Sequence, residues 1–175
     1  HDIENLIQAV KICATEEIPV ELRLIGSSVY IEKYKALVRE LNLEQFVVFL
    51  DEIPHSELPE ELAKMDVCLA IYTRELVSQA NGVEAALKLW EYWAAKKPVI
   101  VTDIKGSNSY NHHDNKRFLA VPPENPKELA DAIIYLYHHP DFADELSTNG
   151  YEYVLQDHSW SSVAKKIEKV LYEAI

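Results

Sequence analysis

Residues 81–103 read NGVEAALKLWEYWAAKKPVIVTD, and this stretch decides the fold. From about Val83 to Ala95 it is apolar at most positions, which predicts a helix buried on nearly every side. Pro98 to Thr102 then forms a short, continuously apolar run, typical of a parallel strand that is covered on both faces. A buried helix that leads directly into a buried strand is the repeating unit of an α/β fold.

The same alternation continues on both sides of this stretch. Apolar spacing predicts strands at Val20–Ile25, Phe46–Leu50, Val67–Ile71 and Phe118–Val121, and helices from an Asp2 cap, at Tyr30–Leu41, at Glu57–Met65 after a Ser56 cap, and at Pro126–Tyr137, Pro140–Leu155 and Ser159–Ala174. Tyr72–Gly82 is predicted to be a loop, and Trp160 and Tyr172 to belong to the core. We therefore predict one α/β domain over residues 1–175, a doubly wound parallel sheet with a helical C-terminal end.

Composition excludes several classes of function. Of the 175 residues, 29 are acidic and 17 basic, for a net charge of −12, which argues against a nucleic-acid partner and against a polybasic membrane anchor. No stretch approaches the ~18 apolar residues that span a membrane. Cys13 and Cys68 lack metal-ligand spacing and are predicted to be buried as small apolar residues. The sequence favours a cytoplasmic protein, and leaves open peripheral membrane association of a full-length form.

A polar seam runs along the apolar helix. Glu84, Lys88 and Glu91 are spaced four and then three residues apart, so they share one stripe of the helix. One interpretation is a surface ladder of ion pairs, worth roughly 0.2–0.5 kcal/mol each. The other is that the seam lines a cleft, where Lys88 meets a phosphate and Glu91 accepts hydrogen bonds from sugar hydroxyls. Gly82 before the helix favours the second, because free N–H groups at a helix start attract anions.

The segment KLWEYWAAKKPVIVTD (88–103) resembles the signature helix and strand of the group-one (family 4-like) glycosyltransferases, in which K-L-x-E-Y-x-A-x-x-K-P-V-I recurs. The resemblance extends in the same order over ELRLIGSS (21–28), LNLEQFVVFLDEIPHSELPEELAKMDVCLAIY (41–72), VPPENPKELADAIIYLYHHPD (121–141) and HSWSSVAKKIEKVLYEAI (158–175). It implies the Rossmann-like C-terminal half of a GT-B enzyme, which binds the nucleotide sugar. His1 falls where the first strand of that half should already have ended, so this strand and the N-terminal acceptor domain are expected to lie outside the chain.

The resemblance also implies roles for single residues. Glu91 matches the acidic residue that binds the ribose hydroxyls, and Lys88 a lysine directed at the diphosphate. The backbone at Ala86 and Leu87 matches the helix start beside the diphosphate and the donor sugar. Ile53 and His55 match the loop beside the nucleobase.

Two positions depart from the family pattern. Many members carry a second acidic residue eight positions before the ribose-binding one, where this chain has Val83; Glu84 is one residue away, a rotation of about 100° on a helix. This departure puts a retaining reaction in doubt. The turn after the second strand of the half usually reads G-S-G, whereas here it is Gly26-Ser27-Ser28.

The function that follows is transfer of a sugar from a nucleoside-diphosphate sugar to an acceptor hydroxyl, on a polysaccharide or a lipid-linked acceptor. We expect no metal and no cofactor besides the donor, and no activity from this fragment alone. The adjacent His112, His113 and Asp114 are interpreted as a solvated loop rather than a metal site. Two alternatives remain: a non-catalytic regulatory or scaffolding module, and a sugar-nucleotide 2-epimerase.

Overall fold

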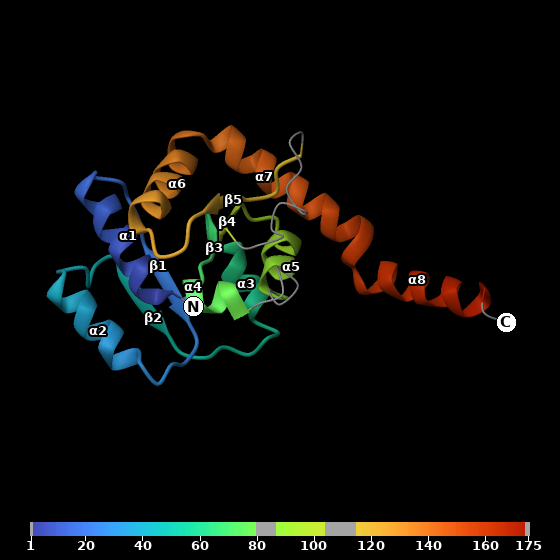
Figure 1. The fold of residues 1–175 in the computed structure, drawn as a ribbon, viewed down its shortest axis with the longest axis horizontal. Helices are drawn as coiled ribbons and strands as arrows, with labels where there is room; N and C mark the ends of the chain where they lie inside the picture. The colour runs from blue at the N-terminus through green and yellow to red at the C-terminus, as the bar shows by residue number, and fades with distance from the viewer. Residues whose placement is uncertain (1, 80–86, 104–114, 174–175) are drawn as a thin grey trace.

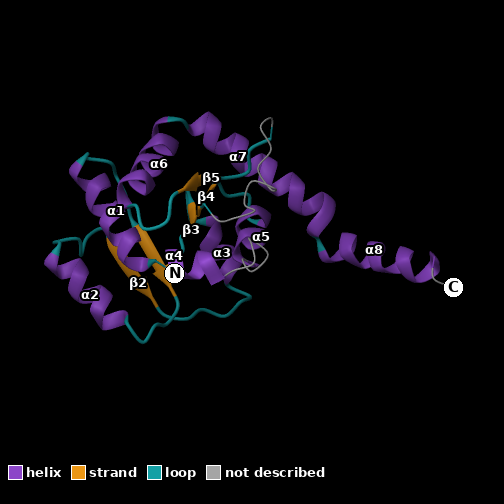
Figure 2. Cartoon of the chain, viewed as in Figure 1, coloured by secondary structure: helices purple, strands orange, loops and turns teal. Residues whose placement is uncertain are grey.

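The structure is a computed structural model that describes residues 2–79, 87–103 and 115–173. Helices and strands alternate along most of the chain, and the last part is helical throughout (Figures 1 and 2). The elements are α1 (Ile3–Thr15), β1 (Leu22–Ile25), α2 (Ile31–Glu40), β2 (Val47–Leu50), α3 (Leu58–Ala63), β3 (Cys68–Ala70), α4 (Arg74–Gln79), α5 (Leu87–Ala94), β4 (Val99–Thr102), β5 (Leu119–Val121), α6 (Pro126–His138), α7 (Pro140–Tyr153), the π-helical turn η3 (Val154–His158) and α8 (Trp160–Glu173).

All described strand pairs are parallel, as the sequence predicts. β1 pairs with β2, with Leu22 opposite Val47, while β4 lies between β3 and β5 in a second sheet. The described strands form a two-stranded and a three-stranded parallel sheet.

Helices cover both faces of the three-stranded sheet, so the doubly wound class is confirmed. Alternate residues of β4 point to opposite sides: Ile100 packs in a core with α1 and α6, whereas Val99 and Val101 pack in a second core with α5. All four residues of β4 are buried, which explains its uninterrupted apolar sequence.

Polar side chains cap three of the predicted helices. Asp2 accepts a hydrogen bond from the amide of Asn5 at 3.2 Å, and Ser159 accepts from the amide of Ser162 at 3.1 Å. Asn125, before α6, accepts from the third residue of that helix at 3.2 Å. The predicted Ser56 cap is wrong, because α3 begins at Leu58 and no side chain caps it.

The C-terminal part differs most from the prediction. The chain passes through η3 after α7, and α8 then extends away from the body of the domain (Figure 1). Trp160 and Tyr172, predicted to lie in the core, are 91% and 74% exposed. A helical apolar pattern identifies the face that can be covered, but not the surface that covers it.

Trp93 of α5 packs directly against α7. Its ring is fully buried, and Nε1 donates a hydrogen bond to the carbonyl of Arg117 at 3.1 Å. Gly150 of α7 lies directly against this ring, since a Cβ atom at that position would come within 2.2 Å of Trp93 Cδ1. The absence of a side chain at Gly150 therefore allows α7 to pack closely on α5.

Candidate functional site

Lys88 and Glu91 lie three residues apart on α5, on the side away from its buried apolar face. Leu89 and Trp93 are almost fully buried against the sheet, whereas Lys88 and Glu91 are half-buried. Burial lowers the pKa of the Lys88 ammonium to about 8, and the nearby Glu91 carboxylate partly opposes this shift. Lys88 is thus a cation held in partly dehydrated surroundings, where it interacts strongly with an anion.

Glu91 and His55 meet although they are 36 residues apart in the sequence. The Nε2 atom of His55 lies 3.1 Å from Glu91 Oε1, and the two side chains are 86% and 37% exposed. A polar contact this exposed adds little stability. Its effect is instead to place the loop after β2 beside the seam of α5, so two residues predicted from the sequence come together.

Tyr72 is a residue beside Lys88 to which the sequence analysis assigned no role. The Nζ atom of Lys88 lies 5.4 Å from the centre of the Tyr72 ring, within the range of a cation–π contact. The backbone amide of Tyr72 donates to Oγ1 of the buried Thr102 at 2.8 Å, which fixes it at the carboxyl ends of β3 and β4. Its position directly after a predicted strand is the end of a parallel sheet at which ligands bind, but that position alone gives it no particular role.

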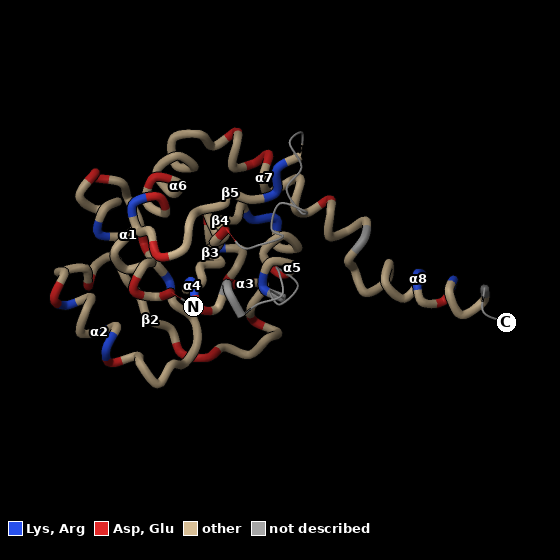
Figure 3. Tube along the Cα trace, viewed as in Figure 1, with Lys and Arg blue, Asp and Glu red and all other residues tan. Residues whose placement is uncertain are grey.

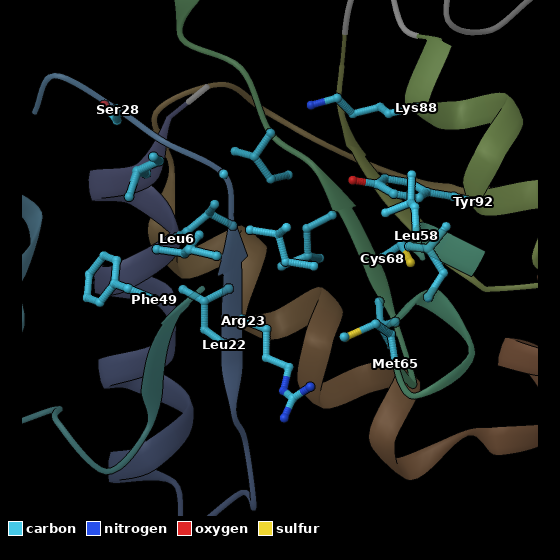
Figure 4. Close-up of a pocket in the computed structure, with 18 of the residues that line it drawn as sticks. Leu6, Leu22, Arg23, Ser28, Phe49, Leu58, Met65, Cys68, Lys88 and Tyr92 are labelled. Atoms are coloured by element: carbon cyan, nitrogen blue, oxygen red, sulfur yellow. The ribbon is translucent and has the colours of Figure 1, made fainter. Parts of the chain in front are cut away.

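A cavity of about 340 Å³ opens beside this seam. Lys88, Glu91 and Tyr92 line it from α5, and the Gly26–Ser28 turn lines it from the end of β1. In Figure 4, the Lys88 ammonium and the Tyr92 hydroxyl both point across the cavity toward the side on which Ser28 lies. Gly26 has a φ of 117°, a conformation that favours glycine, so the chain can turn there without a side chain. A cation, a carboxylate and a glycine turn provide partners for both an anion and hydroxyl groups.

The remaining predicted site residues are Leu87, Ile53 and Ala86, and they do not all lie at the cavity. Leu87 is the first described residue of α5. Ile53 is half-buried in the loop after β2, and is not among the described residues that line the cavity. Ala86, together with Val83 and Glu84, lies outside the described residues, as does the His112–Asp114 segment.

Other classes of site are not found in the described part of the chain. There, no group of three or more His, Cys, Asp or Glu side chains is arranged to hold a metal ion. In the same residues, no helix combines the length and the apolar character needed to cross a bilayer. Lysines and arginines are scattered along the described chain rather than gathered on one face (Figure 3). Cys13 and Cys68 are both buried, as predicted.

These features define a doubly wound α/β domain with a polar site at the carboxyl ends of its parallel strands. The profile of the family described as "Glycosyl transferases group 1" matches residues 1–153. The chain belongs to this family of glycosyltransferases, as the resemblance of its signature helix implied.

Individual relatives of the chain share only about a quarter of its residues. Over 94% of its length the chain is 24% identical to a poly(ribitol-phosphate) alpha-N-acetylglucosaminyltransferase of Staphylococcus aureus, and over 86% it is 27% identical to a GDP-mannose-dependent alpha-(1-6)-phosphatidylinositol monomannoside mannosyltransferase of Mycobacterium tuberculosis. It spans only 31% and 38% of those proteins. The fold is similar to that of Anabaena HepE, solved with UDP and glucose, with a TM-score of 0.79 and 19% identity over 97% of this chain and 44% of that one.

Proposed function

We propose that this chain is the donor-binding half of a glycosyltransferase that moves a sugar from a nucleoside diphosphate to an acceptor hydroxyl. The observation that carries the proposal is the seam of α5. Lys88 and Glu91 line one cavity at the carboxyl ends of the strands, and His55 and Tyr72 contact them from two other segments. Family membership supports the reaction class.

Each polar group of the seam suits one part of the donor. Glu91 accepts hydrogen bonds from the ribose hydroxyls, and His55 contacts the same carboxylate. The ammonium of Lys88 faces the diphosphate, near Leu87, the first described residue of α5. Ile53 lies next to the nucleobase. Because a carboxylate and an ammonium bind different parts of one ligand, replacing them should weaken binding to different extents.

The chemical task is to stabilise a leaving group. The bond from the anomeric carbon to the phosphate oxygen breaks, its electron pair stays on the diphosphate, and the acceptor oxygen forms the new bond. Lys88 neutralises the charge that develops on the diphosphate, so the protein supplies the positive charge without a metal ion. Glu91 positions the nucleotide and takes no part in bond breaking. Any base that removes the acceptor proton would come from the other half of the protein.

Donor and acceptor are proposed only as classes. HepE is described with UDP and glucose, and the M. tuberculosis relative is named for GDP-mannose, so more than one base occurs among similar proteins. The names of the curated relatives include a polymer acceptor and a lipid acceptor. We propose an acceptor of one of these kinds. We also propose a cytoplasmic site of action that is peripheral to a membrane in the full-length protein. This chain alone should not turn over substrate, since its own N-terminal domain would complete the cleft.

Calorimetric titration of this chain with UDP, GDP and ADP tests the proposal. We expect one of the three to bind, with binding abolished in Glu91→Ala and weakened in Lys88→Met. Glu145→Ala, which removes an exposed carboxylate of α7, is the matched control and should bind as the wild type does. Equal binding by all four proteins, or no binding of any nucleotide, would contradict the proposed site.

A further inference from the structure

Tyr72 lies two residues beyond β3, and its backbone is bound to the neighbouring strand. The hydroxyl of Thr102, the last residue of β4, accepts a hydrogen bond from the Tyr72 amide at 2.8 Å and donates a longer one to the Tyr72 carbonyl at 3.4 Å. Thr102 is fully buried, as are the other residues of its strand. Both polar backbone groups of Tyr72 are therefore attached to the interior of the sheet.

The chain just after Tyr72 is held as well. Thr73 accepts a hydrogen bond from the amide of Leu76 at 3.3 Å, at the start of α4. The carboxylate of Glu124, in the loop after β5, accepts from the amide of Arg74 at 3.0 Å and from its Nε at 3.3 Å. Because three successive residues are bound in this way, the direction in which the Tyr72 ring leaves the chain is defined.

Lys88 meets this ring from α5. Its Nζ atom lies 5.4 Å from the ring centre, within the ~6 Å over which an aromatic face attracts an ammonium. A lysine ammonium stands at the end of a flexible four-carbon stem, so it takes a defined position only when another group binds it. A carboxylate would bind it and cancel its charge. A neutral ring binds it and leaves the full charge for a further partner.

We propose that Tyr72 is a positioning residue: the face of its ring holds the Lys88 ammonium at the edge of the cavity, where the charge stays available to an anion. Thr102 and Glu124 act one step further away, since they hold the backbone that carries the ring. The inference rests on the proposed function for the identity of that anion, which is the diphosphate of the donor.

Titratable groups from three segments lie near this ammonium. Glu91 and Tyr92 share its helix, Tyr72 follows β3, and His55 contacts Glu91 from the loop after β2. Burial lowers the pKa of Lys88 to about 8, and Glu91 opposes this shift. Burial raises the pKa of both phenols, so the rings stay neutral while Lys88 titrates. A neutral ring face favours the ammonium over the free amine, so loss of the ring should lower the Lys88 pKa further.

The sign of this change separates positioning from burial alone. If the Tyr72 ring only excluded water, its removal would hydrate the ammonium and raise the pKa of Lys88 toward its usual value. If the ring holds the ammonium, its removal lowers that pKa. Tyr72→Leu removes the aromatic face and keeps an apolar side chain. Tyr72→Phe keeps the face and removes only the hydroxyl, so it is the matched control.

NMR titration of the lysine side chains in isotope-labelled protein, without nucleotide, measures the pKa of Lys88, and the signal missing in Lys88→Met identifies it. We expect Tyr72→Leu to lower this pKa by about 0.5, as the loss of a partly exposed cation–π contact implies, and Tyr72→Phe to leave it unchanged. Tyr72→Met gives the same comparison should Tyr72→Leu not fold. An unchanged or raised pKa without the ring, or an equal decrease in Tyr72→Phe, would overturn the inference.

Calorimetry with the nucleotide that the wild type binds supplies the second readout. The dissociation constant at pH 7 should rise about threefold in Tyr72→Leu, because the ammonium must then be ordered on binding, and stay unchanged in Tyr72→Phe. Equal dissociation constants in all three proteins would show that Lys88 needs no positioning, and would also overturn the inference. A wild type that binds no nucleotide would count against the proposed function, whereas the pKa of Lys88 in the free protein would still decide whether Tyr72 holds the ammonium.

Discussion

The charge of Lys88 should make nucleotide affinity depend on pH in a range where an ordinary lysine would not. Burial lowers the pKa of Lys88 to about 8 in the free protein. A bound diphosphate favours the charged ammonium and returns its pKa toward the usual value, so binding takes up a proton above pH 8. The sign is therefore definite: affinity is highest below the free-protein pKa and falls as pH rises through it.

The size of the effect follows from the pKa of Lys88 in the free protein. With a value near 8, about nine-tenths of the ammonium is charged at pH 7 and about one-tenth at pH 9, so the dissociation constant should rise roughly tenfold between them. In a protein with an unshifted lysine, the change over this range would be well under twofold. Calorimetry at constant ionic strength, with the nucleotide that binds this chain, measures the difference directly.

Two variants isolate the contribution of Lys88. Lys88→Met removes the titrating charge at similar size, so it should bind weakly and lose the tenfold dependence on pH between 7 and 9. Its profile also reveals any titration of the nucleotide itself. Lys88→Arg keeps a charge over the whole range and should also show a flat profile. A tenfold loss that persists in Lys88→Met would refute the reasoning, because another group would then be titrating.

Three further predictions concern stability and reactivity. Gly150→Ala should lower the free energy of unfolding by about 1–3 kcal/mol in urea titration, since the new methyl would meet the buried Trp93 ring at 2.2 Å; an unchanged midpoint would show that the ring can move. Asn125→Ala removes the cap of α6 and should cost about 1 kcal/mol in the same assay, whereas a loss below about 0.3 kcal/mol would mean that solvent replaces the cap. Burial raises the pKa of the Cys68 thiol to about 12, so we expect native protein to react with a maleimide about a hundredfold more slowly than urea-unfolded protein, and comparable rates would contradict its burial.

The sequence predicted those elements whose burial leaves a periodic pattern. β4 is apolar throughout because both of its faces are covered, and α5 is apolar because it lies between the sheet and α7. Helix α4, which lies within the predicted loop, was missed because its six residues are too few to show a period. The π-helical turn η3 was missed because a change in hydrogen-bond spacing has no compositional signal of its own.

The site was predicted in part for a similar reason. Lys88 and Glu91 share a helix, so their spacing alone places them on one stripe. The contact between Glu91 and His55 depends on where the loop after β2 lies relative to α5, which no local pattern describes. Tyr72 stands at a strand end, but only the fold shows that its ring lies under Lys88. The roles expected for Lys88, Glu91 and His55 came from the family resemblance, and spacing alone did not supply them.

The π-helical turn has a mechanical consequence. Trp90 of α5 stacks on His158 of η3 with ring centroids 4.2 Å apart, and on Tyr153 at 6.0 Å. The helix that carries Lys88 and Glu91 therefore also packs against the segment from which α8 begins. Because His158 lies two residues before the start of α8, the position of α8 is coupled to α5 through these stacked rings.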